Sequence, residues 1–281
     1  MTVVVTGASG NVGRPIVEQL LKAGAHVRAV TRRPGRAGFP PAVDEVPDAA
    51  EALKGASAVF LNSRALGAGL TDVVSSAYRH DVGKLVALSA INADDDDTRQ
   101  PSRYRDDRNR ECEQLAAGSG VPWVSLRPTV FASNFPGMWG AQIRAGDVVA
   151  GPYSSASIAP IAEADIAAVA TRALLTDELD GQRVPLTGPQ SLTNAELVEI
   201  LGAVLHRPLR YQEIPAEFVR KRFIENGFSA DFADAYIAML ATTATSPALV
   251  THDVEKILGR PATPFAQWAH AHTALFTEEL T

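Results

Sequence analysis

Three glycines near the start of the chain have a spacing that suits the binding of a phosphate group. Residues 6–13 read TGASGNVG, between an apolar run and a helical pattern. In such a turn one glycine permits the tight bend, one lets the backbone approach a pyrophosphate, and one lets the helix pack on the strand. The free N–H groups and positive dipole end of the helix favour the anion. The expected dinucleotide-binding residues are Gly7, Ser9, Gly10, Asn11, Val12 and Gly13.

The residues after the next apolar segment indicate which dinucleotide binds. Arg32 and Arg33 follow this segment, and no carboxylate occurs before Asp44. A site for NAD typically places Asp or Glu here to bond the ribose 2′-hydroxyl. A guanidinium instead forms charge-assisted hydrogen bonds with a 2′-phosphate. We therefore expect NADP(H) as the cofactor, bound by both arginines; the alternative is that they are merely solvated loop charges.

Short apolar segments alternate with helical patterns along most of the chain. The expected strands are Val3–Val5, His26–Val30, Val43–Val46, Ala58–Leu61, Leu85–Leu88, Trp123–Leu126 and Val184–Leu186. The expected helices are 12–21, Ala49–Leu53, Leu70–His80, Arg105–Ala117 and Ala164–Leu175. This alternation predicts an α/β fold with a doubly wound, Rossmann-like parallel sheet.

In such a sheet the ligand crevice lies at the carboxyl ends of the strands. Two further groups of residues should therefore join the glycine motif there. The residues expected to line the middle of the dinucleotide are Asn62, Ser63, Arg64, Ser89 and Ala90. The hydroxyl of Ser89 is also a candidate catalytic group, although a serine at a strand end often only caps a turn.

Composition excludes several classes of function. The 281 residues carry 26 basic and 32 acidic side chains, a net charge of -6, which disfavours nucleic-acid binding. No apolar run is long enough for a membrane helix, and no secretory signal is recognisable. The single cysteine, Cys112, excludes an internal disulfide and fits a reducing compartment, so we expect a cytoplasmic protein. No spacing of ligand residues predicts a metal site.

Four segments together resemble the NmrA-like branch of the atypical short-chain dehydrogenases/reductases. They are Thr6–Gly13, Glu111–Phe135, Ile161–Leu175 and Leu186–Pro215. The resemblance implies an NAD(P)-binding domain over residues 1–188. It also implies a smaller, mainly helical cap over residues 189–281, with the loop 128–160 contributing to the cleft. Its relatives include NAD(P)H-dependent quinone, azo and imine reductases, and a redox-sensing regulator that binds a dinucleotide without turnover.

The resemblance also shows what is missing. Typical short-chain dehydrogenases use Tyr-x-x-x-Lys as proton donor and helper cation, and aligning the helix at Glu113 places Arg105 and Asn109 in those columns. One position earlier, Tyr104 and Arg108 keep the i, i+4 spacing of one helical face. Tyr104 is therefore a candidate catalytic residue; the alternative is a surface tyrosine at the start of the helix.

The absence of a tyrosine–lysine pair restricts which acceptors the protein is expected to reduce. Reduction of a simple ketone gains about 10²–10⁴-fold from a positioned acid. A quinone, enone or imine accepts hydride with less help, because the product charge is delocalised or neutralised. We expect an NADPH-dependent reductase of such an acceptor. The alternative is a non-catalytic NADP(H)-binding redox sensor that regulates a partner protein.

Aromatic residues are dense in the expected cap, between Tyr211 and Tyr236, and in the segment Phe131–Trp139. Some must form the core of the cap, but their number suits a pocket for a small apolar or aromatic substrate. The residues expected to contact it are Phe131, Asn134, Phe135, Trp139 and Phe228.

Overall fold

The computed structural model describes residues 1–278, which form two compact units. The first unit comprises Met1–Ala93, Asp106–Pro128 and Glu163–Leu186. The second unit comprises Asp94–Arg105, Thr129–Ala162 and the described residues from Thr187 onward. The units interleave along the chain, whereas the expected domains 1–188 and 189–281 are continuous stretches and stay a prediction.

The first unit contains a seven-stranded parallel sheet in the order β3-β2-β1-β4-β5-β6-β9. Its strands are β1 (Thr2–Thr6), β2 (His26–Val30), β3 (Val43–Val46), β4 (Ala58–Asn62), β5 (Lys84–Leu88), β6 (Trp123–Pro128) and β9 (Arg183–Leu186). Val3, Val4 and Val5 of the inner strand β1 are all 0% exposed. Burial on both faces explains why β1, β4 and β5 read as continuous apolar runs. The predicted doubly wound α/β fold is confirmed.

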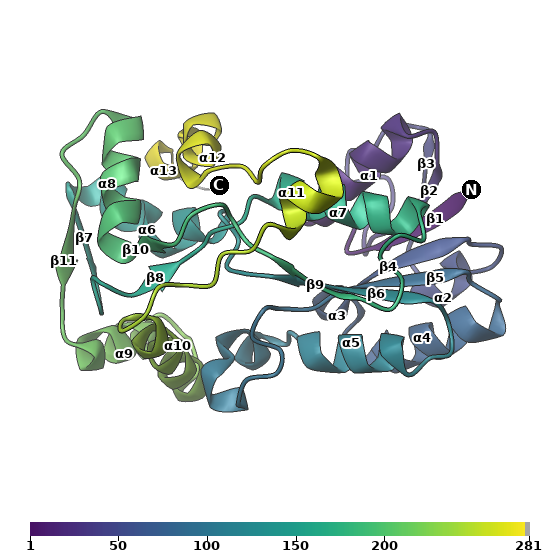
Figure 1. The fold of residues 1–281 in the computed structure, drawn as a ribbon, viewed down its shortest axis with the longest axis horizontal. Coiled ribbons are helices and arrows are strands. Elements are labelled where there is room, and N and C mark those ends of the chain that lie inside the picture. Colours follow the sequence, from purple (N-terminus) through teal and green to yellow (C-terminus); the bar gives the residue numbers. More distant parts are fainter. Residues whose placement is uncertain (279–281) are drawn as a thin grey trace. The chain divides into compact units, whose positions relative to one another are not determined.

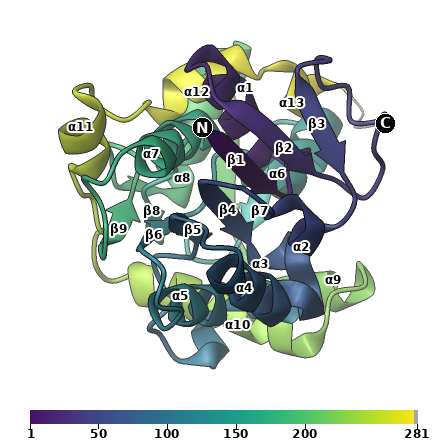
Figure 2. The same ribbon diagram turned by 90° about the vertical axis from the view of Figure 1, so that its right-hand side faces the viewer.

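Helices cover both faces of this sheet (Figures 1 and 2). On one face lie α1 (Gly13–Lys22) and α7 (Glu163–Leu175), and on the other lie α2 (Ala49–Ala52), α4 (Leu70–Arg79) and α5 (Asn109–Ala117). The short α3 (Ser63–Leu66) and the 3-10 turn η1 (Gly67–Gly69) follow β4. Helix α1 buries Ile16, Val17 and Leu20, the apolar stripe expected from its sequence.

The second unit is mainly helical, with two small sheets in which β7 pairs in parallel with β11 and β8 pairs antiparallel with β10. Its strands are β7 (Val148–Gly151), β8 (Ser157–Ile158), β10 (Leu192–Thr193) and β11 (Arg210–Glu213). Its helices are α6 (Asn134–Ala145), α8 (Asn194–Leu205), α9 (Ala216–Glu225), α10 (Ala230–Thr243), α11 (Asp253–Leu258), α12 (Phe265–Ala271) and α13 (Ala274–Thr277), with the 3-10 turns η2 (Asp97–Arg99) and η3 (Pro101–Arg105).

Two local expectations are wrong. The helix expected from Arg105 begins only at Asn109, because Asp106 takes a left-handed conformation (φ 66°) that no helix continues through. The segment from Phe131 to Trp139, expected as a loop, enters helix α6 at Asn134. Pro136 is compatible with this helix, because it lies in the first turn of α6, where proline lacks no needed N–H group.

Candidate functional site

The glycine motif forms a compact turn between β1 and α1. Gly7 has φ +65°, and its carbonyl accepts hydrogen bonding from the N–H of Gly10 at 3.0 Å. Gly13 packs directly on this turn: a Cβ there would lie 2.8 Å from Cα of Ala8 and closer still to the carbonyl oxygen of Gly7. Residues 9–11 are exposed above the buried start of α1. The turn therefore offers backbone N–H groups and the helix dipole to an anion, as the motif predicts.

All the expected cofactor-binding residues lie in the first unit, after the neighbouring strands β2, β1, β4 and β5. Because these strands are parallel, their carboxyl ends meet at one edge of the sheet. Thr6 joins two of them: its hydroxyl donates to the Phe60 carbonyl at 2.9 Å and accepts from the Asn62 N–H at 2.8 Å. The glycine turn is thus attached firmly to the end of β4.

The residues after β4 have structural partners of their own. The Asn62 side chain caps α3 by accepting from the Ala65 N–H at 3.2 Å. The buried Ser63 hydroxyl accepts from the Arg108 N–H at 3.0 Å. The Arg64 guanidinium lies 3.7 Å from the Asp107 carboxylate. These bonds give all three residues a local structural role, and their contact with the dinucleotide stays a prediction.

Arg32 and Arg33 follow β2 and are both exposed. Within residues 1–278 neither guanidinium forms an ion pair or a side-chain hydrogen bond. Two further arginines of the first unit, Arg14 and Arg36, were not among the expected site residues. Their positions in the sequence could have pointed to them, because Arg14 directly follows the third glycine and Arg36 lies in the segment after β2.

Ser89 and Ala90 follow β5. The Ser89 side chain is 3% exposed, its N–H donates to the Leu126 carbonyl at 2.8 Å, and its hydroxyl has no hydrogen-bond partner among the described residues. A buried hydroxyl without a partner is uncommon, because desolvating it costs free energy that a hydrogen bond normally offsets. The hydroxyl thus keeps an unused donor and acceptor, and its contact with a bound molecule stays a prediction.

One buried carboxylate, that of Glu113, connects helix α5 with the neighbouring strands β6 and β9. Glu113 of α5 is 4% exposed and accepts from the Ser125 hydroxyl at 2.5 Å, from Arg127 at 2.6 and 2.8 Å, and from Arg183 at 2.5 Å. Burial by itself raises the pKa of Glu113, but the hydrogen bonds from Arg127, Ser125 and Arg183 outweigh it and hold the pKa at about 2. Glu113 therefore stays ionised and fastens α5 to β6 and β9.

Tyr104 and Arg108 do not share a helical face, contrary to the sequence-based expectation. Tyr104 lies in the 3-10 turn η3 of the second unit and is 37% exposed, whereas Arg108 caps α5 in the first unit. The left-handed Asp106 separates the two elements. Arg105 ends η3 and Asn109 begins α5, so the family's tyrosine and lysine columns hold no equivalent pair.

The expected substrate residues all lie in the second unit, in different environments. Phe135 and Trp139 are 0% and 5% exposed and pack in its core, with ring centroids 4.9 Å apart. Phe131 is half-buried, and Asn134 is exposed at the start of α6. The structure therefore gives Phe135 and Trp139 a packing role, and contact of any of these residues with a substrate stays a prediction.

Phe228, the remaining expected substrate residue, belongs to an aromatic cluster on α9 and α10. Its half-buried ring stacks on Phe232 at 4.6 Å and meets Phe223 edge-on at 5.3 Å. The Arg105 guanidinium lies 5.4 Å from the Phe228 ring centroid. Desolvation by burial raises the pKa of Tyr236, which joins the same cluster. Much of the aromatic density of the cap thus packs on itself.

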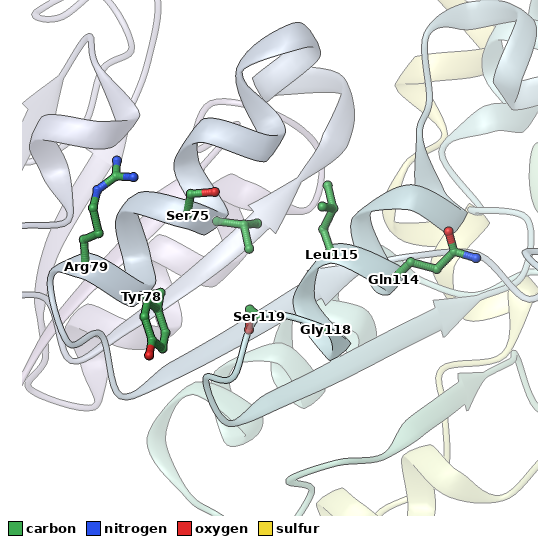
Figure 3. A pocket seen from close by; sticks show the side chains of 8 residues that line it. Ser75, Tyr78, Arg79, Gln114, Leu115, Gly118 and Ser119 are labelled. Atoms are coloured by element: carbon green, nitrogen blue, oxygen red, sulfur yellow. The ribbon is translucent and has the colours of Figure 1, made fainter.

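Two hollows on the surface, one in each unit, are lined by none of the candidate residues. The one in the first unit, of about 400 Å³, lies along α4 and α5, beside the exposed ring of Tyr78 (Figure 3). Its one charged side chain, Arg79, donates to the Ser76 hydroxyl at 2.8 Å. Among residues 1–278 no group of His, Cys, Asp and Glu could hold a metal ion, and no helix there is long and apolar enough to cross a membrane.

Comparison with known proteins agrees with this geometry. A family model described as NAD(P)H-binding matches residues 7–177, more than half of the chain. The chain is 33% identical to a (4-alkanoyl-5-oxo-2,5-dihydrofuran-3-yl)methyl phosphate reductase from Streptomyces griseus, over 99% of this chain and 100% of the relative. It is 28% identical to an NAD(P)H azoreductase from Xenophilus azovorans, over 98% of this chain and 99% of the relative.

Solved structures share the fold. An NADPH-dependent quinone oxidoreductase from Escherichia coli, solved with NADPH, has a TM-score of 0.80 at 21% identity, covering 97% of this chain and 99% of that one. A triphenylmethane reductase from Citrobacter has a TM-score of 0.78 at 18% identity, covering 98% and 99%. The chain belongs to the NAD(P)H-binding, NmrA-like group of atypical short-chain dehydrogenases/reductases, and it is an NAD(P)H-dependent oxidoreductase.

Proposed function

We propose that the chain is an NADPH-dependent reductase of small, conjugated acceptors such as quinones, enones or imines. The nicotinamide group supplies the hydride when it is bound. The first unit contributes the glycine turn, the unpaired Arg32 and Arg33, and the free hydroxyl of Ser89. The observation that carries the proposal is this combination of a phosphate cradle with no tyrosine–lysine pair.

The preference for NADPH rests on the charge after β2. Arg32 and Arg33 are exposed, without ion-pair partners among residues 1–278, so no protein carboxylate competes with a phosphate for them. The nearest acidic side chains in sequence begin at Asp44, on β3. A 2′-phosphate would replace the water around two guanidinium groups with charge-assisted hydrogen bonds.

Replacing Arg32 or Arg33 by alanine should therefore weaken NADPH binding and leave NADH binding nearly unchanged. The expected loss for each variant is about 10- to 100-fold in Kd, corresponding to roughly 1.5–3 kcal/mol for a hydrogen bond to a charged group. Fluorescence titration with both dinucleotides measures the ratio of the Kd for NADPH to the Kd for NADH. Lys22→Gln, which removes a charge at the far end of α1, is the control. Equal weakening of both cofactors would contradict the assignment.

The proposal that the acceptor is conjugated rests on the missing tyrosine–lysine pair, which would otherwise donate the proton. A hydride added to a conjugated carbonyl leaves an enolate, or a quinol anion, whose charge is spread over several atoms. That anion takes one proton, from water or from the Ser89 hydroxyl, to complete the two-electron reduction. The names of the relatives support this class, because azo, quinone and alkanoyl-dihydrofuranone groups are all conjugated acceptors.

Ser89→Ala distinguishes a functional from a structural hydroxyl. Because the hydroxyl makes no hydrogen bond in the protein, its removal should leave Tm unchanged or slightly raised. If the hydroxyl bonds to the bound cofactor or acceptor, kcat/KM should fall by roughly 10-fold, as expected for loss of one hydrogen bond. Thermal unfolding measures Tm, and steady-state kinetics with one acceptor measures kcat/KM. A lower Tm with unchanged kinetics would assign Ser89 a structural role only.

A panel of acceptors tests the function as a whole. Quinones, enones and imines are each mixed with the protein and NADPH, and the loss of NADPH absorbance is followed. Simple ketones are the matched controls, because they lack conjugation and should react at least ~100-fold more slowly without a positioned acid. Tight NADPH binding with no oxidation by any acceptor would overturn the proposal and favour the redox-sensor interpretation.

A further inference from the structure

The segment that carries the expected phosphate-binding arginines has no regular structure. It connects β2 with β3 and contains Arg32, Arg33 and Arg36, all of them exposed. An irregular exposed segment samples many conformations unless contacts restrict it, and mobile side chains bind a ligand more weakly because ordering them costs entropy. The position of these guanidinium groups therefore depends on what holds the segment.

Two residues, Arg14 and Glu45, hold the segment at its middle. Arg14 of α1 donates from Nη2 to the carbonyl of Ala37 at 2.5 Å, and its guanidinium lies 4.8 Å from the centroid of the Phe39 ring. From the other side, Oε2 of Glu45 on β3 accepts from the N–H of Gly35 at 2.8 Å. Residues 35–39 are thus attached to both the first turn of α1 and the third strand.

The backbone of the segment is shaped for these contacts. Gly35 and Gly38 have φ of 76° and 67°, a region that costs glycine little and other residues more. The N–H of Arg36 donates to the carbonyl of Arg33 at 3.1 Å and closes a turn around Pro34. The segment therefore follows one defined path.

Arg14 connects this segment with the glycine turn. It directly follows Gly13, and its own N–H donates to the carbonyl of Gly10 at 3.0 Å. One residue thus has its backbone in the phosphate cradle and its side chain on the arginine-bearing segment. A planar guanidinium can donate a hydrogen bond in its plane while an aromatic ring packs on its face, which a lysine cannot reproduce.

We propose that Arg14 is a positioning residue that, with Phe39, latches residues 32–39 beside the glycine turn and so sets the preference for a dinucleotide with a 2′-phosphate. This inference rests on the proposed use of NADPH. The latch acts through Arg32 and Arg33, so its loss should affect NADPH and spare NADH, which has no phosphate at that position.

Limited trypsin digestion of the full chain without cofactor tests the latch itself. Trypsin cuts after exposed arginines in mobile segments, and the Arg36–Ala37 bond adjoins the carbonyl that Arg14 holds. Arg14→Gln and Phe39→Ala should each raise the rate of cleavage there by roughly 10-fold, as local opening becomes easier. Lys22→Gln on the same helix is the control and should cleave like the unmodified protein.

Titration of the same proteins with NADPH and NADH tests the consequence. Arg14→Gln and Phe39→Ala should each raise the Kd for NADPH by roughly 10-fold, the effect of one lost charge-assisted hydrogen bond, with the Kd for NADH within about twofold. Phe39→Ala removes no charge, so its effect cannot arise from a direct bond between Arg14 and phosphate. It also keeps the test open if Arg14→Gln fails to fold.

Several results would overturn the latch. Cleavage at the unmodified rate in both variants would show that Arg14 and Phe39 do not hold the segment. Faster cleavage with an unchanged ratio of NADPH to NADH affinity would remove its role in specificity. Equal weakening of both dinucleotides in Arg14→Gln would instead place Arg14 on the pyrophosphate. If the unmodified protein binds neither dinucleotide, the proposed function fails, whereas the digestion result still decides whether the latch exists.

Discussion

Replacing Gly13 by alanine is expected to abolish measurable binding of NADPH and of NADH. The new Cβ would lie 2.8 Å from Cα of Ala8, 2.9 Å from the carbonyl carbon of Gly7, and closer still to the oxygen of that carbonyl. These are backbone atoms, so no side-chain rotation relieves the overlap. Either α1 moves away from β1 or the turn opens, and both movements would misplace the N–H groups that we propose to face the pyrophosphate.

The surroundings leave little room for such movement. Thr6 is fixed by hydrogen bonds to Phe60 and Asn62, and Val3–Val5 are completely buried in the middle of the sheet. We expect Kd to rise at least ~100-fold, with a loss of stability of about 1–3 kcal/mol, typical of overpacking in a rigid site. Calorimetric titration and urea unfolding measure the two effects.

A second glycine provides the matched control. Gly137 lies exposed within α6, and a Cβ there would meet no atom within 4 Å. Gly137→Ala should bind both dinucleotides normally and unfold at the same or a slightly higher urea concentration, because alanine favours a helix. Normal NADPH affinity in Gly13→Ala would show that the turn does not form the phosphate cradle, and the proposed cofactor site would have to be abandoned.

Local signals in the sequence were sufficient to predict most of the first unit. The inner strands β1, β4 and β5 appear as short apolar runs because parallel strands are buried on both faces. The short β3 at Val43–Val46 and the helix that begins at Ala49 lie where the spacing between neighbouring elements predicts them.

The errors have a different origin, because they depend on backbone conformation or on distant packing. Helical spacing continued through Asp106, and no neighbour in the sequence indicates its left-handed φ. The packing of Phe135 also depends on the fold: its ring meets that of Phe265 edge-on at 5.0 Å, a contact that local sequence does not predict, and its contact with a substrate stays a prediction. The latch of Arg14 on Ala37 joins residues far apart in sequence, so it also required the structure.

The carboxylate of Glu113 should make a large contribution to the free energy of unfolding. Glu113→Gln keeps the size of the side chain but removes the negative charge beside the Arg127 guanidinium, whose side chain is 13% exposed. Breaking a buried ion pair from one side typically costs about 3–5 kcal/mol. Urea unfolding at neutral pH measures this loss. Glu178→Gln, which breaks the exposed pair with Arg172, is the control and should cost at most about 1 kcal/mol.

The free energy of unfolding differs between the unmodified protein and Glu113→Gln, and the pH dependence of that difference tests whether its origin is electrostatic. The folded pKa of Glu113, about 2, lies below its ordinary value of 4.5, so its contribution is complete above pH 4.5 and is lost as the pH falls toward 2. That contribution amounts to roughly 3 kcal/mol, because one pKa unit corresponds to about 1.4 kcal/mol. Other carboxylates with lowered pKa values, such as Glu196 and Asp234, titrate in both proteins and cancel in the difference. The stability gap between the unmodified protein and Glu113→Gln should therefore narrow between pH 4.5 and 2, and a gap that stays constant over this range would mean that shape, not charge, makes Glu113 necessary.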